Sequence, residues 1–419
     1  MSKPAASLHY AQPVTGLLLT GGGARAAYQV GVLQAVTDIR RACRAHHTPN
    51  PFGILSGTSA GSINAVALAC GADHFDLAVQ RLARHWCDLN VEGVYRADHS
   101  SLLRSGTRWL GLLALGWVFP RRRDLRPRSL LDNAPLRTRL QQALPMNRIP
   151  YLLEHGFLQA VAVTASSYTT GEHVTFFDAR GDQLQAWKRS KRIARRATLT
   201  HEHLLASSAI PFVFPATALP AEAPTEYFGD GSMRQSAPLS PAIHLGAHRI
   251  MVVGAGRVIE PPAVRPDITP AYPSIAQIAG HALSSIFLDA LPLDVERTLR
   301  INQTLSLVPP AQRAQSGLRP LELLVINPSD RLDALAAEHL HDLPPGMRNL
   351  FRVLGVDHRK TDAQSAALAS YLMFTPAYIR ALIAMGHQDT LARREDVVRF
   401  FGWHDHGVAV TPHRSPAHH

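Results

Sequence analysis

The sequence predicts an α/β fold in which a mainly parallel sheet is covered by helices on both faces. Short apolar runs that end in glycine or serine alternate with longer segments of helical periodicity. This alternation is typical of strands joined by helical crossovers, which makes neighbouring strands parallel. The chain has 419 residues, of which 46% are hydrophobic, enough to bury a large core.

The N-terminal half contains the clearest strand and helix pairs. A buried strand is expected at residues 14–20, followed by a helix at 25–44. A second strand is expected at 52–55, followed by a helix at 62–70. Two strands that each lead into a helix place their carboxyl ends side by side at one edge of the sheet.

The rest of the chain is predicted with more mixed structure. Further strands are expected at 158–163, 173–177, 225–228, 249–253 and 321–325, with helices at 199–208, 363–373 and 378–385 and a proline-rich loop at 260–273. The predicted organisation is a disordered N-terminus (1–13), a main domain (14–330) with a helical cap insertion (72–157), a helical C-terminal region (331–403) and a disordered tail (404–419).

Composition narrows the class of protein. The net charge of +11 favours an anionic partner, and two basic clusters (residues 121–128 and 188–196) contribute to it. No nucleic-acid-binding signature accompanies them, so an anionic membrane surface is the expected partner and nucleic acid is not. Three cysteines without a C-x-x-C pair, and no apolar signal segment or transmembrane run, predict a cytoplasmic protein, with a peripheral site at the inner membrane surface as the further expectation.

The first glycine cluster, Gly21, Gly22 and Gly23 followed by Arg25, lies between a strand and a helix. Its amides can therefore point at an anion. A dinucleotide site would also need an acidic residue at the end of the next strand, and none is present there. The remaining interpretation is an oxyanion hole, in which glycine amides hold the charge of a tetrahedral intermediate.

Ser59 lies in a G-x-S-x-G pentapeptide between Gly57 and Gly61. A strand precedes the pentapeptide and a helix follows it, which is the context of a nucleophile elbow. A serine hydroxyl needs a base to become a nucleophile. Asp230, between two glycines after a short apolar run, can supply that base, although in isolation it is more typical of an ordinary turn.

Four segments in this order resemble the patatin-like phospholipase family. They are the G-G-G-x-R loop, the G-x-S-x-G pentapeptide, the segment 207–215, and Asp230-Gly231-Ser232 as the D-G-G/A block. The resemblance implies a three-layer α/β/α fold and lipid acyl hydrolysis by a Ser–Asp dyad without histidine. It would make Ser59 the nucleophile and Asp230 its base, with residues 21–23 as the oxyanion hole and Arg25 shaping that loop.

The chain departs from the family pattern at three positions. Ala26 follows the loop where glycine is usual, Ser232 replaces a glycine or alanine, and Ser236 stands where asparagine is frequent. None of these changes removes a catalytic side chain, but Ser232 lies beside the proposed base and can alter its pKa.

A Ser-His-Asp triad is the mechanistic alternative. It would require a histidine after Asp230, such as His281, His339 or His387. None of the three lies in a distinguishing turn motif, and the chain has 22 histidines, so the dyad is the simpler hypothesis.

An 11-residue apolar stretch at 109–119 is bracketed by arginines and carries tryptophans near both ends. It is too short to span a bilayer and suits either a buried cap helix or an interfacial segment. The sequence therefore predicts a serine hydrolase of membrane lipid acyl esters, of phospholipase A or lysophospholipase type, with no metal or organic cofactor. The alternatives are an acyltransferase and a catalytically weak membrane-binding protein that keeps the fold.

Overall fold

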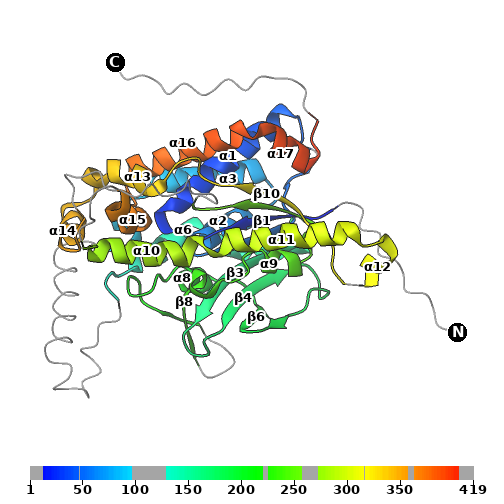
Figure 1. Cartoon of the computed structure of the whole chain (residues 1–419), viewed down its shortest axis with the longest axis horizontal. Helices are drawn as coiled ribbons and strands as arrows, with labels where there is room; N and C mark the ends of the chain where they lie inside the picture. Colours follow the sequence, from blue (N-terminus) through cyan, green and yellow to red (C-terminus); the bar gives the residue numbers. More distant parts are fainter. Residues whose placement is uncertain are drawn as a thin grey trace.

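The structure is a computed structural model that describes residues 13–46, 48–96, 129–219, 225–256, 272–315, 317–356 and 363–404 (Figure 1). The apolar stretch 109–119, the basic cluster 121–128 and both predicted disordered ends apart from Pro13 and His404 lie outside these ranges. The predicted loop at 260–273 falls outside them almost entirely.

A ten-stranded sheet forms the centre of the molecule, in the order β10-β9-β1-β2-β3-β4-β6-β5 with β8 and β7 attached to β3. Its strands are β1 Thr15–Leu19, β2 Ile54–Thr58, β3 Ala160–Ser167, β4 His173–Ala179, β5 Lys188–Arg189, β6 Arg192–Arg196, β7 Thr217–Leu219, β8 Glu226–Asp230, β9 Arg249–Val253 and β10 Glu322–Ile326. The strands from β10 to β3 in this order are parallel, whereas β4 and β8 pair with β3 in the antiparallel sense.

Helices cover both faces of the sheet. They are α1 Ala27–Ala42, α2 Ala60–Ala69, α3 Phe75–Cys87, α4 Val91–Val94, α6 Ala134–Ala143, α7 Ile149–Glu154, α8 His201–Ser207, α9 Ser240–His244, α10 Ile275–Leu288, α11 Ala290–Leu307, α12 Pro310–Gln315, α13 Leu332–Glu338, α14 Pro345–Val353, α15 Ala363–Leu372, α16 Pro376–Ala392 and α17 Arg394–Phe401. Short 3₁₀ turns lie at η1 Gly23–Ala26, η3 Met146–Arg148, η4 Gly231–Arg234 and η5 Leu340–Asp342.

The hydrophobic core divides into two clusters because strand side chains alternate between faces. On β1, Leu17 and Leu19 belong to the larger cluster with α1, α2, α3 and α16, whereas Leu18 belongs to the smaller one with α9 and the start of α11 (Figure 1). Two helical layers therefore enclose the sheet, which confirms the predicted three-layer α/β/α fold.

The C-terminal helices pack into the same core as the first helix. Gly31 of α1 lies against the Ile383 carbonyl of α16, and Gly386 of α16 lies against the Tyr28 carbonyl of α1. A side chain at either glycine would collide with backbone of the other helix. The pair of glycines lets the two helices approach closely, which attaches the C-terminal region firmly to the sheet layer.

Several elements were absent from the sequence prediction. The segment 275–307 forms α10 and α11, and the short strands β5, β6 and β7 extend the sheet. The described parts of the 72–157 segment are helical in α3, α4, α6 and α7. Of these helices, α3 packs against α1 and α2, whereas α6 packs against α4 and α8, and none of the four belongs to the sheet.

Two described helical segments are long and apolar enough to match the requirements of a membrane span. Ile275–Leu307 is a 33-residue run, and Ala366–Leu372 with Pro376–Ala392 would make a second, bent by 92°. In this structure α11 is a layer of the fold, since the buried Asp294 carboxylate accepts the Leu239 amide at 2.9 Å. Length and composition alone therefore do not make Ile275–Leu307 a span.

Candidate active site

The turn after β2 holds Ser59 in a strained conformation. Its backbone φ is 54°, in the left-handed region that non-glycine residues rarely adopt. Gly57 lies against the backbone of Gly61, and Gly61 lies against the Leu19 carbonyl, so a side chain at either glycine would collide with main chain. The two glycines of the pentapeptide are thus what allows the chain to turn sharply at Ser59 and enter α2.

Side-chain hydrogen bonds hold the Ser59 backbone from both sides. The Ser59 amide donates to Ser207 Oγ at 2.8 Å, and the Ser207 hydroxyl donates to the Thr164 carbonyl of β3 at 2.6 Å. The Ser62 hydroxyl donates to the Ser59 carbonyl at 2.6 Å. Ser207 therefore links the end of α8, the turn and the central sheet through one fully buried hydroxyl.

Strand pairing brings Asp230 to Ser59. Thr58, the last residue of β2, pairs with Thr164 of β3, and Asp230, the last residue of β8, pairs with Ala165, the next residue of β3. The antiparallel β8 therefore ends beside the point where β2 ends. The structure places the two predicted catalytic side chains next to each other although 171 positions separate them in the sequence (230 − 59).

Asp230 is completely buried, and this burial raises the pKa of its carboxyl to about 6. Oδ1 accepts the Ser232 amide at 2.9 Å. Among the described residues no donor reaches Oδ2 with standard hydrogen-bond geometry, yet the Ser59 and Ser232 hydroxyls lie close enough to lower the pKa somewhat. A carboxylate with this pKa is ionised at neutral pH and still basic enough to accept a proton.

The glycine loop lies directly beside Ser59. A side chain on Gly21 would meet Ser59 Cβ at 3.0 Å, and Gly23, with a φ of 55°, lies against the Tyr371 carbonyl of α15. The loop opens the 3₁₀ turn η1, so its amides have no preceding helical turn to bind. Gly21 is therefore in contact range of Ser59, and Gly23 lines the same pocket as Ser59.

Arg25 points away from this loop and into α15. Its Nε donates to Ser370 Oγ at 2.8 Å, and its guanidinium lies 4.1 Å from the centre of the Tyr371 ring. The side chain is almost completely buried. Arg25 thus anchors the loop against the C-terminal helices and does not itself face Ser59, in agreement with a shaping role.

The three histidines of the alternative triad lie elsewhere. His339 is paired with Asp342 and His387 with Asp38, each at 2.9 Å, and His281 is exposed on α10. Within the described ranges no histidine is hydrogen-bonded to Ser59 or Asp230. The geometry supports a two-residue site.

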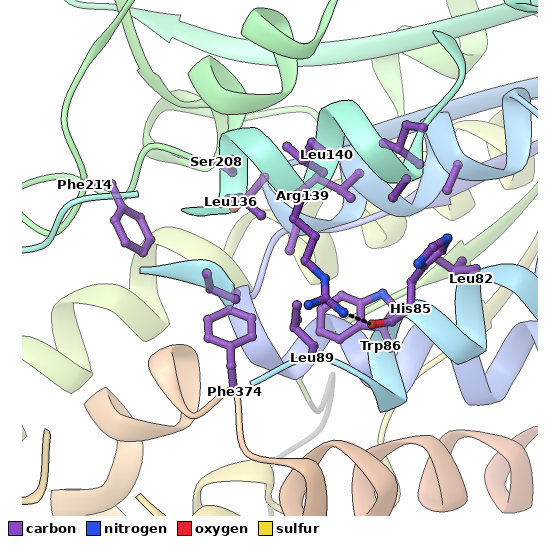
Figure 2. A pocket seen from close by; sticks show the side chains of 18 of the residues that line it. Leu82, His85, Trp86, Leu89, Leu136, Arg139, Leu140, Ser208, Phe214 and Phe374 are labelled. Carbon is purple, nitrogen blue, oxygen red and sulfur yellow. Dashed lines mark hydrogen bonds between the residues drawn. The ribbon is translucent and has the colours of Figure 1, made fainter. Parts of the chain in front are cut away.

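An apolar pocket begins at Ser59 and runs beneath the helices of the 72–157 segment. Its cavity volume is about 90 Å³, and the space between its lining atoms, open solvent included, is about 800 Å³. Figure 2 shows its walls, which come from α2, α3, α6, the segment after α8 and Phe374. Its side chains include Ile63, Leu82, Trp86, Leu136, Leu140, Ile210 and Phe214.

Arg139 is the main charged group in this wall. It extends from α6 and donates to the carbonyl of His85 in the last turn of α3 at 3.5 Å and to that of Asp88, just beyond this helix, at 3.0 Å (Figure 2). These bonds tie α6 to α3 across the pocket. Apart from Arg139, His85 and the Ser59 and Ser208 hydroxyls the lining is mostly apolar, which suits a fatty acyl chain.

Sequence reasoning missed the positioning role of Ser207 and the individual pocket residues. The sequence indicates the 207–215 segment only as a block, because a serine hydroxyl that bonds to backbone has no sequence pattern of its own.

Among the residues that the structure describes, no group of three or more His, Cys, Asp or Glu side chains could hold a metal ion.

Comparison with known proteins identifies the family. The profile described as "Patatin-like phospholipase" matches residues 17–243, slightly more than half of the chain, and includes every segment of the site. The protein is a member of the patatin-like phospholipase family. Membership identifies the fold as the patatin fold and supports an ester hydrolase that acts on lipid acyl groups.

The other comparisons add little. No curated protein sequence matches this patatin-like chain. A structural match, the crystal structure of VipD from Legionella pneumophila, is 13% identical and covers 92% of this chain and 67% of that one, with a TM-score of 0.31.

Proposed function

We propose that this patatin-like protein hydrolyses acyl esters of membrane lipids by a Ser59–Asp230 dyad, as a phospholipase A or lysophospholipase. The observation that carries the proposal is that the Ser59–Asp230 pair adjoins the apolar pocket. The strained serine lies beside a buried carboxylate on one side and opens into an apolar pocket on the other. The pocket supports an acyl chain as the group held next to the nucleophile.

In the proposed reaction the Ser59 oxygen attacks the ester carbonyl carbon while Asp230 takes the hydroxyl proton. The tetrahedral intermediate collapses, its bond to the alcohol breaks, and Asp230 returns the proton to the departing alkoxide oxygen. A water molecule then attacks the acyl-enzyme and gives its proton to Asp230. Collapse of the second intermediate releases the fatty acid, and the Ser59 oxygen recovers a proton from Asp230.

The amides of residues 21–23 would carry the negative charge of each intermediate. Gly21 of this loop lies in contact range of Ser59, and Arg25 anchors the loop to α15. Loss of a single such donor typically slows the chemical step by about 10²- to 10³-fold. The loop is therefore assigned to electrostatic stabilisation and Arg25 to its placement.

The proposed partner is an anionic membrane surface that presents the lipid. The positive net charge supports it, and the β5–β6 hairpin carries exposed Lys188, Arg189 and Lys191. The apolar stretch 109–119 remains a candidate for an interfacial segment, and a cytoplasmic location with peripheral attachment to the inner membrane surface remains the accompanying hypothesis.

The deciding experiment compares the wild type with Ser59→Ala and Asp230→Asn on a panel of phospholipids and lysophospholipids. Both variants are expected to lose at least about 10³-fold in kcat/KM, because each removes a reacting group. A fluorophosphonate probe should label the wild type and fail to label Ser59→Ala. Activity that survives Ser59→Ala would falsify the mechanism.

The remaining alternatives give distinct results. A protein that only binds membranes would not react with the fluorophosphonate. An acyltransferase would form a new ester when an alcohol or lysolipid is supplied, so product analysis separates transfer from hydrolysis.

A further inference from the structure

Ser232 carries an unusual hydroxyl next to the proposed base. Its side chain is 5% exposed, and its Oγ has no hydrogen-bond partner among the described residues. The hydroxyl lies beside the glycine loop, because a side chain on Gly21 would meet Ser232 Oγ at 2.5 Å. The same side chain would meet Ser59 Cβ at 3.0 Å. The Ser232 amide already binds Asp230 Oδ1.

A buried hydroxyl without a partner destabilises the folded state by about 1–3 kcal/mol. Buried polar groups that lack a partner are also rare in native proteins. The second unpartnered atom in this small region is Asp230 Oδ2. Ser232 therefore offers a spare donor and Asp230 a spare acceptor, two positions apart in one turn.

We propose that Ser232 is a positioning residue whose hydroxyl donates a hydrogen bond to the Asp230 carboxylate and so keeps this base ionised and ready to accept the Ser59 proton. This role rests on the proposed function. Where the family pattern carries glycine or alanine at this position, that donor is missing. Ser232 would thus extend activity of this chain toward more acidic conditions.

The direction in which the Ser232 hydroxyl shifts the pKa of Asp230 follows from the charge of the carboxylate. A donor stabilises the carboxylate form, and the Ser232 hydroxyl indeed lowers the pKa of Asp230 against the upward effect of burial. Without the hydroxyl, Asp230 binds its proton more tightly. The enzyme then loses its base at a higher pH.

Other groups near Asp230 do not titrate in the relevant range. Three titratable side chains on elements beside Asp230 have shifted pKa values: Tyr168, His173 and His203. Burial lowers the pKa of His173 and of His203 to about 4, and burial together with Asp230 raises the pKa of the Tyr168 phenol. Between pH 5 and 9 these three side chains stay neutral, so Asp230 is the group of this set that changes charge.

The test is the pH profile of kcat/KM on a soluble ester for the wild type, Ser232→Ala and Ser306→Ala. The Ser306 hydroxyl bonds a carbonyl within exposed α11 and serves as the matched control. In Ser232→Ala the acidic limb should move to higher pH by about 0.5 to 1, while activity above pH 8 stays within about threefold of wild type. Ser306→Ala should keep the wild-type limb.

Thermal unfolding separates this role from a structural one. Ser232→Ala should lower the Tm at pH 8 by more than at pH 5, because the lost donor stabilises only the ionised form of the Asp230 carboxyl. An unmoved acidic limb would overturn the inference and leave the Ser59 mechanism intact. An equal loss of kcat at every pH, about 10²-fold, would overturn it too, since that result marks an oxyanion donor.

Discussion

At the scale of single residues, Asp230 is held in a state that favours function over stability. Burial raises the pKa of its carboxyl from 3.8 to about 6, so the folded state disfavours the charge that the reaction needs. Above pH 6 the folded protein holds an ionised group that the unfolded chain solvates better. Asp230→Asn should therefore increase the free energy of unfolding at pH 8 by about 2 kcal/mol while abolishing hydrolysis.

The pH dependence of unfolding tests whether the ionised Asp230 carboxylate destabilises the folded state. Between about pH 4 and 6 the folded wild type binds a proton that the unfolded chain has released, so wild-type stability falls as the pH rises through this window. Urea unfolding of both proteins at pH 4.5 and pH 8 should show a larger difference at pH 8. An equal difference at both values would contradict the raised pKa.

Ser207 is the second residue whose loss has a defined result. Ser207→Ala leaves the Ser59 amide and the Thr164 carbonyl without their buried partner. We expect the free energy of unfolding to fall by about 2 kcal/mol and kcat/KM to fall by about tenfold or more, because the turn that presents Ser59 loosens. Thr390→Val is the control, since this hydroxyl bonds only the Gly386 carbonyl within α16. A drop in stability with unchanged kcat/KM would show that the turn keeps its shape without Ser207.

At the scale of elements, α2 leads from the nucleophile into the apolar pocket. Ala67 lies on the pocket side, eight residues beyond Ser59, which corresponds to about 12 Å along the helix axis. Ala67→Trp should obstruct the pocket at this depth. Activity on a long-chain ester should fall by about tenfold or more, whereas activity on a butyrate ester should stay within about threefold.

Gln142→Trp provides the matched control for this substitution. Gln142 is exposed on α6 and outside the pocket lining, so the same bulky side chain is added without filling the pocket. Its chain-length preference should equal that of the wild type. If Ala67→Trp reduces activity on both esters equally, the pocket does not hold the acyl chain.

Prediction of the elements succeeded where local signals are strong. The strands and helices on either side of Ser59 and Gly21 follow from apolar runs, glycines and helical periodicity, and β1, β2, α1 and α2 confirm them. The helices of the 275–307 segment were not predicted, because its apolar residues do not fall on one helical face. Both Ile278 and Leu283 lie on α10, the first half-exposed and the second buried against the core.

The sequence predicts the reacting residues of the site better than it predicts the contacts that hold them in place. Glycine and aspartate in tight turns carry recognisable patterns, so Ser59 and Asp230 could be named from sequence. Their proximity depends on an antiparallel β8 that ends beside the parallel β2. Neither strand direction nor the Ser207 bridge is encoded in a local pattern, since both depend on which strands become neighbours.

At the scale of the whole molecule, the candidate active site and the basic β5–β6 hairpin lie at the same edge of the sheet. β3 passes the end of β2, where Thr58 pairs with Thr164, and continues toward the same edge, where Ser166 pairs with His173, the first residue of β4. His173 in turn pairs with Arg192, the first residue of β6. The β5–β6 turn, with Lys188 and Lys191, therefore projects from the same edge as the nucleophile.

This arrangement predicts how the enzyme meets an anionic membrane. Each basic residue near such a surface contributes about 1 kcal/mol, so Lys188→Glu combined with Lys191→Glu should weaken binding to phosphatidylglycerol vesicles by more than tenfold. Binding of the wild type should weaken as salt rises, because mobile ions screen these charges. Hydrolysis of a soluble ester should stay unchanged in the double variant, since neither lysine lies in the site.

The control must change the same charge at the far edge of the sheet. Arg41 and Arg44 lie at and just beyond the end of α1, which starts at the site edge and runs away from it, and both are exposed. Arg41→Glu with Arg44→Glu gives the same net charge as the lysine pair. If both double variants lose vesicle binding equally, net charge governs attraction; loss confined to the lysine pair shows that the edge carrying Ser59 faces the lipid.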